Sequence, residues 1–169
     1  MSKNIIKADD KHVDTFDLGG AVWKIQIPGP ETGNQFSLVE SISPPGIGSP
    51  LHRHIRADQA IYVLEGELEI LADSKSFFFA KGETCLIRRG SPHREINSSR
   101  SETRFITIHS PGFFSEFIRL AGIPVPVGGC RQRSRVHSWS SLAVSYAAES
   151  IDFKKPQFRF RDTSPRDPG

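Results

Sequence analysis

The sequence predicts an all-β barrel built from short antiparallel strands. Between residues 21 and 111, runs rich in β-branched and aromatic residues are separated every eight to twelve residues by clusters of Gly, Pro, Asn and Ser. The period within the runs is two, since Ile61 and Val63 fall on one face of an extended strand and Tyr62 and Leu64 on the other. No internal repeat divides the chain, so a single barrel is expected.

Seven runs are expected to form strands, and turn-forming residues end each of them. They are residues 21–28, 35–42, 60–71, 76–80, 84–89, 93–96 and 103–110. After residue 111 the spacing of apolar residues becomes helical, so residues 112–122 are predicted to form a helix that covers the barrel. A second amphipathic helix is expected over residues 138–151, after a linker.

The 169 residues suit one domain with an appendage. The expected organisation is a barrel with its covering helix at 1–123, a linker and second helix at 124–153, and a disordered tail at 154–169. The net charge of +3 arises after residue 123, where 8 Lys and Arg accompany 4 Asp and Glu. These short basic clusters carry no recognition motif, so we expect solvated surface and no nucleic-acid partner.

Composition excludes several other classes of protein. With 37% hydrophobic and 24% charged residues, the chain is typical of globular proteins, and no apolar run is long enough to cross a bilayer. The N-terminal residues 1–20 mix charges of both signs without the apolar core of a secretory signal, so a cytoplasmic protein is expected. Cys85 and Cys130 lie too far apart for a disulfide framework or paired zinc ligands.

Three histidines are the candidate metal ligands. His52 and His54 are separated by one residue, so both imidazoles point to the same face if this segment is a strand. His93 begins another predicted strand after a turn. Neutral imidazoles suit zinc, nickel, copper or iron(II), whereas calcium and magnesium prefer oxygen ligands. A His-x-His pair also occurs by chance, so spacing alone leaves open that these are ordinary histidines.

The segments around these histidines resemble the two motifs of the cupins. The first, GSPLHRHIRADQAIYVLEG, runs from Gly48 to Gly66, and the second, GETCLIRRGSPHREIN, from Gly82 to Asn97. The flanking segments are similar to those of bacterial quercetin 2,3-dioxygenase-like monocupins, so the resemblance covers about residues 20–123. It implies a single-domain cupin of the cupin_2 type: a jelly-roll β-barrel with one or two C-terminal helices packed outside. The resemblance does not identify the activity, because cupins include oxygenases, isomerases, storage proteins and transcription factors.

By this resemblance His52, His54 and His93 bind a divalent transition metal, which could be Zn, Ni, Fe, Mn or Cu. Gln59 stands where the family has a glutamate, and Arg88 where the second motif usually has a proline. A glutamine offers a neutral carbonyl oxygen and can neither add a negative charge to the site nor take a proton. Weak metal retention is therefore expected, with Gln59 as a weak fourth contact and no residue assigned to catalysis.

The position of Gln59 requires an interruption in the chain. Gln59 and His54 are an odd number of residues apart, so they share a face only if a bulge or turn lies at 55–58. Asp58 then faces away from the histidines. A pocket is expected around the metal, with a wall of four apolar residues and one histidine at the mouth of the barrel. That histidine could instead lie on the surface. These residues are Phe36, Leu38, Ile61, Val63 and His109.

Two classes of function remain open from the sequence. One is a quercetinase-like dioxygenase that acts on a small enolic or phenolic compound. The other is a non-catalytic cupin that binds a small molecule or a metal, for which the missing glutamate is the best argument. A metal-assisted isomerase is a further alternative. A homodimer is also expected, because single-domain cupins pair through exposed strands such as the Phe-rich run at 77–79.

Overall fold

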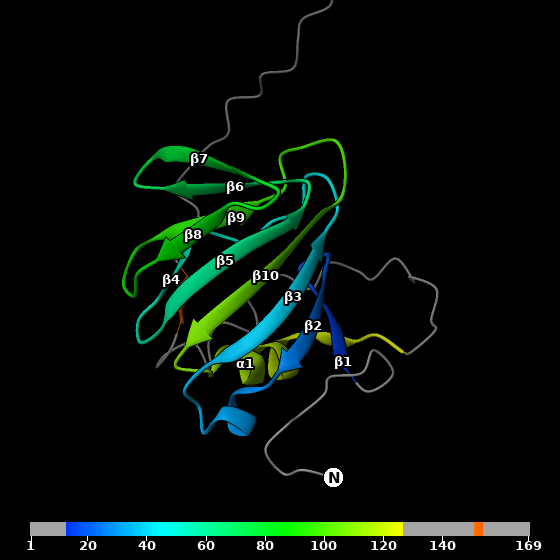
Figure 1. Cartoon of the computed structure of the whole chain (residues 1–169), viewed down its shortest axis with the longest axis vertical. Helices are drawn as coiled ribbons and strands as arrows, with labels where there is room; N and C mark the ends of the chain where they lie inside the picture. The colour runs from blue at the N-terminus through cyan, green and yellow to red at the C-terminus, as the bar shows by residue number, and fades with distance from the viewer. Residues whose placement is uncertain (1–12, 127–150, 154–169) are drawn as a thin grey trace, which may run out of the picture.

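The computed structural model describes residues 13–126 and 151–153, which form a barrel of two antiparallel sheets (Figure 1). In spatial order, the larger sheet contains β11 (Ile123–Pro124), β1 (Asp14–Leu18), β2 (Ala21–Ile27), β3 (Ser37–Ser43), β10 (Thr103–Ser110), β5 (Asp58–Glu65) and β8 (Thr84–Ile87). The smaller sheet contains β12 (Ile151–Phe153), β4 (His52–His54), β9 (His93–Ile96), β6 (Glu67–Ala72) and β7 (Lys75–Ala80). The predicted all-β barrel is therefore confirmed.

Each of the seven predicted runs contains a strand, and the long run at 60–71 contains two. Gly66 divides it with a φ of 79°, a left-handed conformation that favours glycine, so β5 and β6 belong to different sheets. Glu67 begins β6 and is exposed, as expected for a residue that follows this turn. The first cupin-like motif ends at this glycine and contributes β4 to the smaller sheet and β5 to the larger one.

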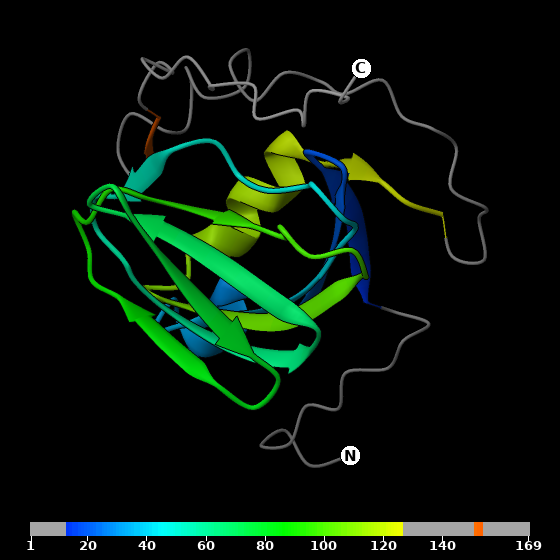
Figure 2. The same ribbon diagram turned by 90° about the horizontal axis from the view of Figure 1, so that it is seen from above.

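One helix, α1 (Phe114–Ala121), packs against the barrel, as the helical spacing predicts (Figure 2). It buries Phe117 and Ile118, which are 4% and 0% exposed. Phe114 lies edge-on to Trp23 of β2 at a ring-centroid distance of 5.7 Å. The apolar face of α1 thus joins the core formed by the inner residues of the larger sheet. A single-turn 3-10 helix, η1 (Gly29–Thr32), connects β2 to β3. No helix in the described part of the chain is long and apolar enough to cross a membrane.

The C-terminal organisation differs from the prediction. Most of the predicted second helix, like the predicted tail, lies outside the described residues, but Ile151–Phe153 form β12, a strand antiparallel to β4. The assignment of these three residues to a helix or linker is therefore wrong. The predicted linker also begins too early, since Ile123–Pro124 form β11 beside β1. A segment of three residues is too short to show a helical or strand periodicity in its sequence. Only its pairing with β4 identifies β12 as a strand.

Gly48 allows the segment before β4 to dock closely on β9. A Cβ at this position would collide with the backbone oxygen of Glu95 and with Ile96. Gly48 forms an isolated antiparallel bridge to Ile96, and the next N–H, of Ser49, donates to the Glu95 oxygen at 2.8 Å. This close approach fixes β4 against the strand that carries His93.

Candidate metal centre

His52, His54 and His93 converge inside the barrel. His52 and His54 project from the same face of β4, and His52 lies directly opposite His93 in the pairing of β4 with β9. One possible ligand atom from each of the three lies within 4.8 Å of the others. Their exposed fractions are 6%, 4% and 0%. The structure therefore brings together the three residues that sequence spacing and resemblance select.

Backbone carbonyls fix two of the rings. Nδ1 of His52 lies 2.9 Å from the oxygen of Pro50, and Nδ1 of His93 lies 2.9 Å from the oxygen of Ser91. A carbonyl only accepts hydrogen bonds, so Nδ1 is the protonated nitrogen in each ring and the lone pair of the neutral imidazole is on Nε2. Backbone carbonyls hold the ring orientation of metal-binding histidines in this way.

Gln59 reaches the histidines because the chain is interrupted after β4. Residues 55–57 belong to neither strand, and β5 begins at Asp58, which confirms the turn that residue parity requires. Gln59 is 2% exposed, and its Oε1 lies 3.1 Å from Nε2 of His54 and 3.1 Å from Nε2 of His93. The amide oxygen is thus the fourth polar atom at the centre.

Asp58 faces away from the centre, as predicted. Its carboxylate accepts hydrogen bonds from Nε of Arg89 at 3.1 Å and from Nη2 of Arg89 at 2.9 Å. These contacts lower the pKa of Asp58 to about 2. Asp58 is therefore an outer partner of Arg89 and does not replace the carboxylate that position 59 lacks.

Sequence reasoning missed Glu95, although the parity of β9 could have found it. Glu95 lies two residues after His93 and therefore on the same, inward face of the strand, where it is 5% exposed. Nε2 of Gln59 donates to Oε1 of Glu95 at 2.5 Å and to Oγ1 of Thr107 at 3.1 Å. These two acceptors turn the amide so that its oxygen faces the histidines.

His109 lies beside the centre and not at a barrel mouth. It is fully buried, its ring stacks on Phe114 at a centroid distance of 4.0 Å, and it lies 4.7 Å from the ring of His54. Neither ring nitrogen has a hydrogen-bond partner among the described residues. His109 thus closes the α1 side of the centre.

Burial favours the neutral form of His52, His54 and His109. Desolvation, followed by repulsion from His93, lowers the pKa of His52 to about 4. Desolvation also lowers the pKa of His54 and of His109 well below the usual value of 6.5, and the neighbouring histidines add to each shift. Neutral imidazoles are the form that binds metal ions.

The facing acceptor atoms fit a metal ion. The lone pair on Nε2 of a neutral His93 faces the carbonyl oxygen of Gln59 at 3.1 Å, and two acceptors so close repel unless a cation or a proton accompanies them. With ligand bonds of about 2.1 Å, two ligands at a right angle around one ion lie about 3.0 Å apart. Three imidazoles and one neutral oxygen suit a transition metal better than calcium or magnesium.

The predicted pocket wall is partly wrong. Phe36 is 36% exposed, and Leu38 lies on the opposite face of β3 from the buried Ser37 and Val39, so neither borders the histidines. Ile61 and Val63 do point inward, but each is 1% exposed and belongs to the hydrophobic core. The inner face of β3 near the centre is polar, which the apolar pattern of the strand does not reveal.

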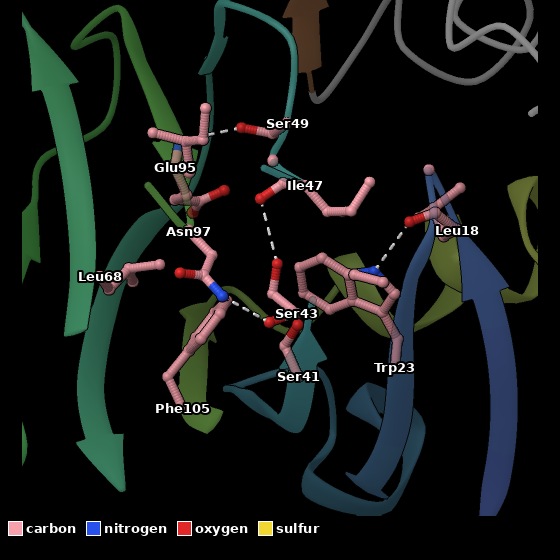
Figure 3. Close-up of a pocket in the computed structure, with 14 residues that line it drawn as sticks. Leu18, Trp23, Ser41, Ser43, Ile47, Ser49, Leu68, Glu95, Asn97 and Phe105 are labelled. Atoms are coloured by element: carbon pink, nitrogen blue, oxygen red, sulfur yellow. Dashed lines mark hydrogen bonds between the residues drawn. The ribbon is translucent and has the colours of Figure 1, made fainter. Parts of the chain in front are cut away.

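Glu95 also lines a small pocket (Figure 3). Its apolar wall includes Trp23, Leu68 and Phe105, and serines from β3 and from the segment before β4 add hydroxyl groups. Ser41 is fully buried in this wall, and its Oγ has no partner among the described residues. Glu95 therefore lines the pocket and also contacts the amide that reaches the histidines.

Comparisons with known proteins identify the same region. Residues 39–109 match the family model for the cupin domain, Cupin_2. The chain is 28% identical over 98 residues to an uncharacterized protein of Methanocaldococcus jannaschii, which covers 58% of this chain and 78% of that protein. It is also 28% identical over 107 residues to the quercetin 2,3-dioxygenase of Bacillus subtilis, which covers 63% of this chain and 32% of that protein, so the chain spans about a third of the dioxygenase.

A solved structure supports the fold assignment. The predicted oxalate decarboxylase of Thermotoga maritima matches with a TM-score of 0.57 at 17% identity, covering 63% of this chain and 99% of that one. The matched family region contains both motifs and all three histidines. Residues 39–109 therefore match the cupin domain, and this part of the chain has the cupin fold.

Proposed function

We propose that this cupin binds a divalent transition metal ion through His52, His54 and His93, with the carbonyl oxygen of Gln59 as a fourth contact. The observation that carries the proposal is the convergence of possible ligand atoms in a buried site: Oε1 of Gln59 lies 3.1 Å from Nε2 of both His54 and His93. Zinc, nickel, iron, manganese and copper are all compatible with this set of donors.

The finer proposal is an enzyme that acts on a small enolic or phenolic compound, as a quercetinase-like dioxygenase does. A bound metal supplies Lewis acidity toward a substrate oxygen and, if redox-active, brings O2 next to an activated carbon. The protein residues hold the imidazoles rigidly, exclude water and present the pocket beyond Glu95.

The alternative proposal is a non-catalytic cupin that binds a metal or small molecule, or a metal-assisted isomerase. Gln59 favours the non-catalytic binder among these, because an amide cannot remove a proton from a substrate. Oxygen uptake by metal-loaded protein with a panel of flavonols separates the candidates. Uptake that needs both metal and flavonol supports the dioxygenase, whereas no uptake with the iron, nickel, manganese and copper forms removes it.

Metal binding itself is expected to depend on the histidines. After equilibrium dialysis and elemental analysis, the parent protein should hold one metal ion per chain. Loss of the outer hydrogen-bond partner of a ligand lowers metal affinity by roughly 10–100-fold. His54→Ala removes a ligand itself, so it should lower the affinity by more than that. Asp58→Asn is a suitable control, because Asp58 is close in sequence but pairs outward with Arg89. Equal metal content in parent and His54→Ala would contradict the proposal.

We further propose that the chain forms a homodimer and binds no nucleic acid. Exposed large apolar side chains on β5, β7 and β8 support the pairing. Tyr62, Phe77, Phe78 and Leu86 are 45%, 47%, 56% and 59% exposed. The cytoplasmic location stays a prediction from the sequence.

A further inference from the structure

Glu95 is a buried carboxylate beside the proposed metal ligands. It is 5% exposed, and its Oε1 lies 4.0 Å from Nε2 of His93. Within residues 13–126, no arginine or lysine forms an ion pair with it. Its backbone is fixed, because the N–H of Glu95 donates to the hydroxyl of Ser49 at 3.0 Å. A buried carboxylate without a cationic partner is costly, so a cation in its vicinity would stabilise it.

Glu95 determines which end of the Gln59 amide faces the histidines. An ionised carboxylate only accepts hydrogen bonds, so the NH2 group of Gln59 must turn toward it. Nε2 accordingly donates to Glu95 at 2.5 Å and to Thr107 at 3.1 Å. The amide is planar, so its oxygen then points the other way, toward His54 and His93. An amide rotated by half a turn would present NH2, which cannot bind a metal ion.

We propose that Glu95 is a positioning residue that directs the Gln59 oxygen onto the metal and supplies the negative charge of the site. This proposal rests on the metal binding proposed above. A glutamate at position 59 would provide an oxygen donor and a charge in one side chain. Here the two roles are divided between two side chains. Gln59 provides the oxygen donor, and Glu95 provides the charge, with its Oε1 at 2.5 Å from Nε2 of Gln59.

The test measures metal affinity in the full chain and needs no substrate. Zinc dissociation constants are compared, by competition with a chromogenic chelator, for the parent, Glu95→Gln, the exchange variant Gln59→Glu/Glu95→Gln, and Glu67→Gln. Glu95→Gln is expected to weaken zinc binding by about 10–100-fold. The exchange variant is expected to regain at least the parent affinity, because it again contains one carboxylate and one amide. Glu67 is exposed on β6, so Glu67→Gln should bind zinc as the parent does.

A second readout distinguishes positioning from general stability. The visible absorption of bound Co2+ reports its ligand set, and Glu95→Gln should change this spectrum because the amide at position 59 is no longer held. Thr107→Val removes the other acceptor without altering charge and should change the spectrum in the same direction, with a smaller loss of affinity. Thermal unfolding of each metal-free variant shows whether the fold is retained.

The possible outcomes separate this inference from the proposed function. If the parent binds zinc, and Glu95→Gln binds it equally with an unchanged Co2+ spectrum, the role of Glu95 is overturned while metal binding stands. If the parent binds no zinc, metal binding is overturned, and the role of Glu95 with it. If Glu95→Gln does not fold, the zinc affinity of the exchange variant decides. An affinity equal to that of the parent supports the inference. An affinity about 10-fold or more below that of the parent, as expected for Glu95→Gln alone, overturns it.

Discussion

Gln59→Glu is expected to destabilise the metal-free protein by about 3–5 kcal/mol, the usual cost of an uncompensated buried charge. In the parent, Nε2 of Gln59 donates to Glu95 at 2.5 Å. In the variant, a carboxylate oxygen stands at that place, so the hydrogen bond is replaced by repulsion between two buried negative charges. Urea unfolding in the presence of a chelator measures the difference in the free energy of unfolding.

Zinc is expected to reverse this loss, because a divalent ion compensates both carboxylates and stabilises only the folded state. The matched control is Gln26→Glu on β2. Nε2 of Gln26 also donates to a glutamate, Glu40 at 3.2 Å, but on the partly exposed outer face, where Arg104 lies 2.6 Å from Glu40. That control should change stability by no more than about 0.5 kcal/mol. Equal stability of metal-free parent and Gln59→Glu would show that residue 59 does not lie against Glu95.

Local geometry predicts part of the ligand set, and the resemblance to the cupin motifs implied the rest. Two histidines at alternate positions share a face of any strand, and the turn before His93 places it at the start of the neighbouring strand. Parity also predicted that the chain between His54 and Gln59 must leave the strand, which it does at residues 55–57. The meeting of His93 with the other two histidines depends on the pairing of β4 with β9, so it was implied by the resemblance and not by spacing.

The pocket could not be predicted in the same way. Hydrophobic alternation assigns Leu38 to the interior of β3, yet the inward residues are Ser37, Val39 and Ser41, together with Ser43. The barrel interior is polar near the metal centre, and the outer face of the same sheet carries apolar side chains such as Ile108, which is 38% exposed. Apart from Val39, the inward side chains of this strand are serines, so apolar alternation assigns its inner face wrongly.

Two further features depend on contacts between distant segments. The hydrogen bond between Gln59 and Glu95 joins residues 36 positions apart, in different sheets, so only the pairing of the strands reveals it. Parity places Glu95 on the inward face but does not say which residue it meets. The three residues of β12 pair with β4 across about a hundred positions and carry no period of their own.

The metal-free protein is expected to lose stability in mild acid. Folded His52 takes up a proton only near pH 4, whereas the unfolded chain takes it up near 6.5. Between these values the unfolded state binds more protons, so the stabilisation is fully present above pH 6.5 and is lost as the pH falls toward 4. A shift of this size corresponds to roughly 3 kcal/mol for His52 alone. Urea unfolding at pH 8, 6 and 4.5 in the presence of a chelator measures the loss.

His109→Leu separates this acid sensitivity from metal binding. The lowered pKa of His109 adds to the loss in acid, and its two ring nitrogens have no partner among the described residues, so leucine should maintain or raise stability at pH 8. The variant should also lose less stability between pH 8 and pH 4.5. In the parent, zinc should lower the pH at which folding stability is lost, because protons must then displace the ion from His52, His54 and His93. A parent protein equally stable at pH 8 and pH 4.5 without metal would show that the imidazoles are open to solvent. A water-filled cluster would protonate freely, and the buried lone pairs from which metal binding is inferred would not exist.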